Sequence, residues 1–155
     1  MTKKRSRIYV VHSPSQGVLD SLDQIGAAFS ELNFEAAFLP LDDSTTKRVQ
    51  KLIRAGIKIL CAAGGDGTQN AVAGMISGTS IRLGVIPVGT LNHFAKDIGT
   101  PIDIAESVKA IVRGRVQPLD VAEVNGKVFL NNSSIGLYPT IVTFRERHEG
   151  SLGKW

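Results

Sequence analysis

Cysteine, tryptophan and long hydrophobic runs are scarce in this chain of 155 residues, which has one cysteine, one tryptophan and six prolines. The lone Cys61 cannot form an internal disulfide, and no cysteine–histidine spacing typical of a zinc site occurs. The apolar run nearest the N-terminus, residues 8–11, is too short for the core of a signal peptide or for a membrane span. These absences predict a cytoplasmic protein for which any membrane contact would be peripheral, at the inner face.

The composition is that of a folded protein, with 43% hydrophobic and 21% charged residues. The formal net charge is +4, and much of the excess lies in residues 3–7 and 145–154. A basic surface could meet nucleotide phosphates, anionic lipid or nucleic acid. For residues 3–7 a solvated tail is the better interpretation. We expect no nucleic-acid partner, and a homodimer stays open.

Apolar segments of strand length alternate with segments of helical periodicity along the first 115 residues. The segment 57–63 is continuously apolar, which is typical of a parallel strand that is buried on both faces. Strands are expected at 8–11, 34–39, 57–63 and 81–86. Helices are expected at 17–32, from the N-cap Ser44 to Gly56, at 68–77, at 92–98, and from Pro101 in a first turn to Gly114. This alternation predicts an α/β fold with a doubly wound, mostly parallel sheet.

The pattern changes after Arg115. Residues 116–124 and 127–132 flank Asn125-Gly126, a pair that suits a type I′ turn, so they predict a β-hairpin. We therefore divide the chain into an α/β domain at 1–115 and, at 116–155, a hairpin and tail that open a β-rich second domain continuing beyond Trp155.

In open α/β sheets, ligands bind outside the carboxyl ends of the strands, and four loops are expected there, at 13–17, 39–44, 64–68 and 87–92. The sharpest is Gly64-Gly65-Asp66-Gly67-Thr68, whose glycines allow close approach of a ligand and whose following helix offers N–H groups to an anion. Asp66 adds negative charge to this loop. It suits a Mg²⁺ ion between carboxylate and phosphate, or it caps the helix that follows the loop.

The loop after the fourth strand has Gly89, Thr90 and Asn92, which could bond a phosphate or cap the next helix. The Walker P-loop lysine is absent, and a third glycine of the dinucleotide motif is replaced by Asn70. No Asp or Glu occurs between Asp66 and Asp97. Dinucleotide binding of the Rossmann kind is therefore disfavoured.

Together these loops resemble the diacylglycerol kinase catalytic family, which includes sphingosine kinases and bacterial lipid kinases. The matching segments are residues 64–68 (GGDGT), 86–97 (IPVGTLNHFAKD) and 130–136 (LNNSSIG). The first motif alone is shared with NAD kinases and phosphofructokinases. The second and third narrow the resemblance to the lipid kinases.

The resemblance implies transfer of the ATP γ-phosphoryl group to a lipid hydroxyl with Mg²⁺. It places Asp66 and Asp120 at the metal. The nucleotide contacts expected from the loops and the resemblance are Ser13, Gly64, Gly65, Asp66, Gly67, Thr68, Gly89, Thr90 and Asn92.

Three positions depart from the family pattern. Ser13 stands where the family has a nucleotide-contacting Asn, residues 40–43 lack the usual Thr, and His93 replaces an Asp. The family takes its catalytic base from the β-rich domain, beyond Trp155, so this chain alone is expected to bind nucleotide but to be a poor catalyst. A kinase of a soluble acceptor, a non-catalytic regulatory module, and glycines that only shape turns remain the alternatives.

Overall fold

The computed structural model describes residues 6–131 of the chain. Its central feature is a parallel sheet of four strands in the order β2-β1-β3-β4. The strands are β1 (Ser6–His12), β2 (Phe34–Pro40), β3 (Ile59–Gly64) and β4 (Arg82–Pro87). The helices are α1 (Gln16–Leu19), α2 (Leu22–Glu31), α3 (Thr45–Arg54), α4 (Asp66–Ile76), α5 (His93–Asp97) and α6 (Ile104–Arg113). The predicted α/β fold is confirmed.

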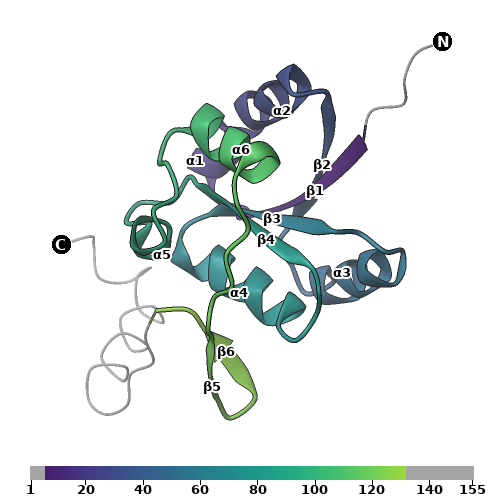
Figure 1. The fold of residues 1–155 in the computed structure, drawn as a ribbon, viewed down its shortest axis with the longest axis vertical. Coiled ribbons are helices and arrows are strands. Elements are labelled where there is room, and N and C mark those ends of the chain that lie inside the picture. Colours follow the sequence, from purple (N-terminus) through teal and green to yellow (C-terminus); the bar gives the residue numbers. More distant parts are fainter. Residues whose placement is uncertain (1–5, 132–155) are drawn as a thin grey trace, which may run out of the picture.

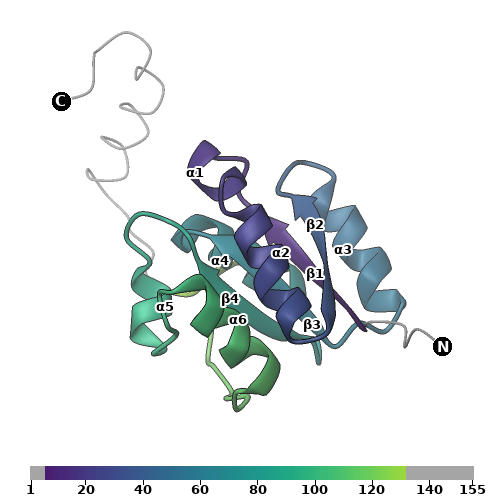
Figure 2. The same ribbon diagram turned by 90° about the horizontal axis from the view of Figure 1, so that it is seen from above.

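Helices cover both faces of the sheet (Figure 1). On one face α2 and α6 bury Phe29 and Val108 against strand residues such as Val10 and Cys61. On the other face α3 and α4 contribute Val49 and Val72 to a second cluster. Seen from above, α5 and α6 lie beside β4 (Figure 2), and both helices contact that strand. The sheet is thus the middle layer of three.

The centre of the sheet is fully apolar, as the continuous run in the sequence predicted. Leu60, Cys61, Ala62 and Ala63 are all 0% exposed. Burial raises the pKa of the Cys61 thiol to about 12, because a thiolate would lose its hydration there. Cys61 therefore acts as a small hydrophobic side chain rather than as a nucleophile.

The helix expected at 17–32 is broken in two. Its apolar positions Val18, Ile25 and Phe29 are buried as predicted, but α1 ends at Leu19 and α2 begins at Leu22. The hydroxyl of Ser21 donates to the carbonyl of Gly17 at 2.9 Å. A serine that bonds the preceding turn in this way competes with the helix backbone, which accounts for the break.

Helix boundaries differ in two further places. Pro101 lies outside α6, which begins at Ile104 after the N-cap Asp103, whose carboxylate accepts from the N–H of Glu106 at 3.0 Å. The helix expected from Thr68 begins earlier, at Asp66. The stop signals Gly56 and Gly78 are confirmed, with φ of +79° and +72°.

The hairpin is present but shorter than expected. Strands β5 (Ala122–Val124) and β6 (Lys127–Phe129) pair antiparallel around Asn125 and Gly126, whose φ angles of 50° and 75° fit a type I′ turn. The hairpin is a sheet of its own and packs on α4 through β6 (Figure 1). Residues 116–121 are not in a strand. The continuation of the predicted β-rich domain lies outside the described residues.

No helix within residues 6–131 is long and apolar enough to cross a membrane.

Candidate functional site

The four predicted loops leave the sheet at one edge. The register pairs His12 with Pro40 and with Ala63, and Gly64 with Pro87, so the carboxyl ends of all four strands are level. In a parallel sheet this is the edge at which ligands bind.

The two glycine-rich loops at this edge touch through their backbones. A side chain at Gly89 would overlap the Cα of Gly65 and come within 2.6 Å of its nitrogen. A side chain at Gly65 would lie 3.4 Å from the Cα of Gly89. The loops after β3 and β4 therefore form one continuous surface, and glycine at position 89 makes it possible.

Asp66 joins the same two loops. Its carboxylate accepts hydrogen bonds from the backbone N–H groups of Phe94 at 2.8 Å and His93 at 3.2 Å. These groups belong to the first turn of α5, so Asp66 caps α5 although it is itself the first residue of α4. The sequence predicted either a metal contact or a cap on the following helix, α4. The carboxylate instead caps α5.

Asn92 shapes the second loop from within. It is 5% exposed and has a left-handed backbone with φ of +52°. Its amide nitrogen donates to the carbonyls of Gly89 at 2.7 Å and Pro87 at 3.2 Å, and its Oδ1 accepts from the N–H of Gly89 at 3.0 Å. The side chain is committed to the loop backbone, and its predicted contact with nucleotide stays a prediction.

The N-terminus of α4 has two N–H groups that make no hydrogen bond within residues 6–131. The N–H groups of Asp66 and Gly67 precede the first intrahelical bonds, which run from Thr68 and Gln69 to the carbonyl of Gly65. Gly67 is exposed, and a side chain there would meet nothing within 4 Å. Unbonded N–H groups at the start of an eleven-residue helix, beside an uncrowded glycine, suit an anion.

Thr68 and Gln69 hold the turn into α4. Thr68 is buried directly over Gly64, where an added Cβ would lie 2.7 Å from the threonine Cβ. The amide of Gln69 is fully buried and donates to the carbonyl of Gly64 at 3.0 Å. Gly64 and Thr68 are therefore shape-determining residues of the loop.

The hydroxyl groups of the other two predicted nucleotide contacts, Thr90 and Ser13, differ in whether they already make hydrogen bonds within the protein. Thr90 is exposed and its hydroxyl makes no bond within the described part of the chain. Ser13 donates to the hydroxyl of Ser15 and accepts from its N–H, both at 3.2 Å. His12 was not singled out from the sequence; it is 5% exposed and packs edge-on against Phe38, with 6.3 Å between the ring centroids.

The loop after β2 is closed by an internal cluster around Asp42. Its carboxylate accepts from the hydroxyl of Ser44 at 2.7 Å, from the N–H of Ser44 at 2.8 Å and from Arg48 at 2.8 Å. The hydrogen bond from the Ser44 hydroxyl contributes most to lowering the pKa of Asp42, and the bond from the Ser44 N–H comes next. Asp42 is thus occupied by the protein itself.

The two carboxylates expected at a metal are not brought together by any contact. Asp120 is exposed and makes no hydrogen bond or ion pair within residues 6–131. That part of the chain also holds no cluster of three His, Cys, Asp or Glu side chains that could bind a metal ion. Mg²⁺ at phosphates commonly uses only one or two carboxylates besides the substrate oxygens. The donor set therefore fits a metal that arrives with a nucleotide better than a resident one.

Asn70 is a residue whose role the sequence did not reveal. Its amide nitrogen donates to the carbonyl of Val128 at 3.2 Å, and its Oδ1 accepts from the N–H of Leu130 at 3.0 Å. These bonds clamp β6 to α4, one turn from Asp66. A polar residue among the apolar positions of α4 was the available signal, but its partners lie 58 and 60 residues away.

Comparisons with known proteins identify the family of the chain. The model of the diacylglycerol kinase catalytic domain matches residues 8–124. The chain is 35% identical over 109 residues to a Klebsiella pneumoniae protein named "Probable lipid kinase YegS-like", covering 68% of this chain and 37% of that protein. It is 34% identical over 137 residues to the diacylglycerol kinase of Bacillus subtilis, covering 83% of this chain and 44% of that enzyme.

The fold is also similar to that of a solved diacylglycerol kinase structure from Bacillus anthracis, with a TM-score of 0.61 and 24% identity over 84% of this chain and 47% of the other. The chain thus spans less than half the length of these relatives. The match to the family model extends through the α/β sheet and into the hairpin. This chain belongs to the diacylglycerol kinase catalytic domain family.

Proposed function

We propose that this chain supplies the ATP-binding part of a lipid kinase, which transfers the γ-phosphoryl group of ATP to a lipid hydroxyl. The observation that supports it most is the junction of the two glycine loops, where the N–H groups of Asp66 and Gly67 make no hydrogen bond within the described residues and a side chain at Gly67 would meet nothing within 4 Å. The relatives named as lipid kinase and diacylglycerol kinase point to the same chemistry.

The triphosphate would lie over the start of α4. Backbone N–H groups and the positive end of the helix dipole attract phosphate oxygens there. The hydroxyl of Thr90, exposed on the neighbouring loop, is placed to add a donor from the other side. Ser13, at the end of β1, is the remaining polar candidate for the nucleoside end.

Mg²⁺ would be held by the phosphates together with Asp66 and, through water, Asp120. Each Asp66 oxygen accepts one backbone N–H and keeps a further lone pair for a metal-bound water. The metal would neutralise charge on the transferring phosphoryl group. His93 contributes its backbone N–H to Asp66 and supplies no carboxylate at this position.

The residues that bind the lipid acceptor and the base that activates its hydroxyl are proposed to lie outside residues 6–131. Phosphoryl transfer needs a group that positions or deprotonates the attacking hydroxyl. Asp66 is engaged by α5, and Asp42 is engaged by Ser44 and Arg48. We therefore expect ATP binding without efficient catalysis from the chain alone, with any contact to the lipid surface peripheral.

Binding of MgATP to the 155-residue chain tests this proposal. MgATP at a hundredfold excess over its Kd should raise the free energy of unfolding by about 2.7 kcal/mol, and ATP without metal should raise it less. Equal stabilisation by NAD, tested in parallel, would favour a soluble acceptor. No stabilisation by MgATP at millimolar concentration would remove nucleotide binding from the account.

A further inference from the structure

A cavity runs along β4, and no residue of the two glycine loops lines it. It is open to the surface, has a volume of about 390 Å³ and is lined mainly by β4, α6, residues 98–101 and residues 114–119. β4 is an edge strand of the described sheet, and the segment that leaves α6 passes over this edge on its way to the hairpin (Figure 1). A volume of this size is typical of small-molecule sites.

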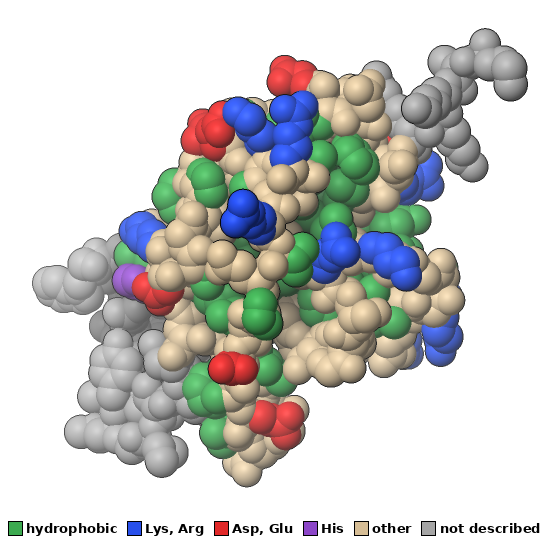
Figure 3. Space-filling view, in the orientation of Figure 1, with side chains coloured by type: hydrophobic (Ala, Val, Ile, Leu, Met, Phe, Trp, Pro, Cys, Tyr) green, Lys and Arg blue, Asp and Glu red, His purple; other side chains and the backbone are tan. Residues whose placement is uncertain are grey.

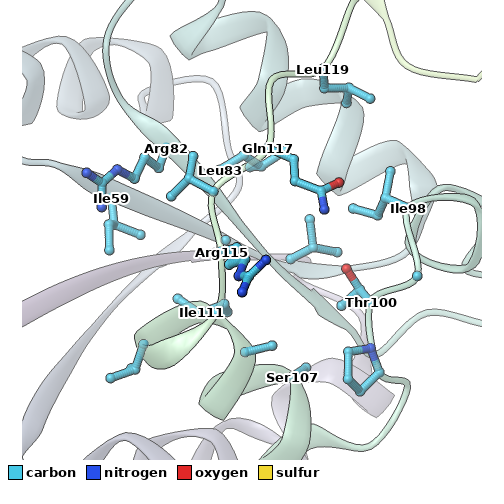
Figure 4. Close-up of a pocket in the computed structure, with 18 of the residues that line it drawn as sticks. Ile59, Arg82, Leu83, Ile98, Thr100, Ser107, Ile111, Arg115, Gln117 and Leu119 are labelled. Atoms are coloured by element: carbon cyan, nitrogen blue, oxygen red, sulfur yellow. The ribbon is translucent and has the colours of Figure 1, made fainter.

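Among the described residues that line the cavity, two are arginines, both exposed, and none is a carboxylate. Arg82 begins β4 and Arg115 follows α6, and neither forms an ion pair within the described residues. In Figure 4, Arg82 lies with Ile59 at one end, Ile98 and Thr100 lie at the other, and Arg115 stands between them. The cavity therefore has positive charge without an internal counterion.

The rest of the wall is largely apolar. Leu83, Val85, Phe94 and Ile111 form part of it from three different elements. Leu119 and Val116 also line the cavity and are 50% and 64% exposed, so the apolar wall continues to the surface. The face in Figure 3 likewise shows hydrophobic atoms beside Lys or Arg side chains over the segment that descends from α6.

We propose that this cavity binds a phosphate monoester with an apolar body, with the phosphate at Arg82 and Arg115 and the apolar part along β4 and α6. Two guanidinium groups match a doubly charged phosphate better than a single carboxylate, because each presents a planar fork of donors. A nucleoside triphosphate fits poorly, since its polar body would meet Leu83, Val85 and Ile111. None of the proposed nucleotide contacts lines the cavity, which adjoins them through Phe94, whose N–H donates a hydrogen bond to Asp66.

The probe is octyl phosphate, titrated calorimetrically into the full 155-residue chain below its micelle concentration. Inorganic phosphate tests the head alone, and octyl glucoside tests the same tail on a neutral head. One octyl phosphate should bind per chain, at least about tenfold more tightly than either comparator. Hexyl phosphate, shorter by two methylenes, should bind about tenfold more weakly if the tail is buried.

Arg82→Gln and Arg115→Gln should each weaken octyl phosphate binding about tenfold, as expected for loss of a charge-assisted hydrogen bond. Lys51→Gln is the matched control, because Lys51 is exposed on α3, across the sheet, and makes no ion pair in the described residues. Amide NMR shifts should move at residues 98–100 and 111, and saturating MgATP should not displace the ligand.

Three outcomes would each overturn the proposal. One is unchanged octyl phosphate affinity in both arginine variants. Another is equal affinity for inorganic phosphate, which would mean a charged surface without an apolar pocket. The third is full displacement by MgATP, which would place the ligand at the glycine loops instead.

Discussion

The carboxylate of Asp66 accepts a hydrogen bond of 2.8 Å from the backbone N–H of Phe94, a residue 28 positions further along the chain. Together with the bond from His93, it fixes the start of α5 against the start of α4. The aspartate in the first glycine loop therefore determines where the second loop lies. A role at Mg²⁺ would come in addition to this one.

Replacing Asp66 by Ala should destabilise the chain even without nucleotide. The two N–H groups of α5 would lose their acceptor, which lowers the free energy of unfolding by about 1–3 kcal/mol. Asp66→Asn keeps one carbonyl acceptor, so its free energy of unfolding should lie between those of Asp66→Ala and the parent chain. Urea unfolding followed by circular dichroism measures both. Asp43→Ala is the control, since Asp43 is exposed and unbonded in the described residues; an equal loss in both alanine variants would contradict the capping role.

Gly89→Ala should separate the two glycine loops. The added methyl group would overlap the backbone of Gly65, and backbone cannot move aside as a flexible side chain can. We expect a loss of about 1–3 kcal/mol in stability together with weaker MgATP binding. Gly17→Ala in α1, where nothing lies within 4 Å, should leave MgATP binding unchanged and the chain at least as stable as the parent. Wild-type stability in Gly89→Ala would show that the loops do not touch.

The pKa of Asp42 predicts how stability depends on pH. Because bonds from Ser44 and Arg48 lower this pKa below its ordinary value of 3.8, the carboxylate stabilises the folded state above 3.8. That contribution is lost as the pH falls through the lower folded value. Urea midpoints at neutral pH and near the folded pKa should show a smaller acid-induced drop in Asp42→Asn and in Ser44→Ala than in the parent. An undiminished drop in both variants would argue against this coupling, and Asp43→Asn serves as the control.

The fold was predictable because its signals are local. The buried strands are continuous apolar runs, and Gly56 and Gly78 mark helix ends where a left-handed residue is needed. The break between α1 and α2 was not predicted, because the apolar spacing of Val18, Ile25 and Phe29 runs through it. The hydrogen bond from the Ser21 side chain to the Gly17 carbonyl accompanies the break in the helix and leaves that spacing unchanged.

The meeting of the two glycine loops at one sheet edge was predictable from the sequence, but the bonds within and between them were not. Glycines at the ends of two parallel strands indicate a phosphate-binding edge from sequence alone. The partners of Asp66 and Asn70, by contrast, lie 27 to 60 residues away. Nor did the sequence suggest that Arg82 and Arg115, which begin a strand and follow a helix, line one cavity.

The most direct test of the central claim compares Gly67→Ala with Gly74→Ala in α4. Neither added methyl group is crowded, since Gly67 faces open space and the nearest atom to Gly74 is 3.9 Å away on Val128. Both variants should fold at least as stably as the parent, because alanine favours a helix by up to about 1 kcal/mol over glycine. Calorimetric titration with MgATP should show at least about tenfold weaker binding in Gly67→Ala and unchanged binding in Gly74→Ala. Parental affinity in both would contradict a triphosphate lying over the N-terminus of α4.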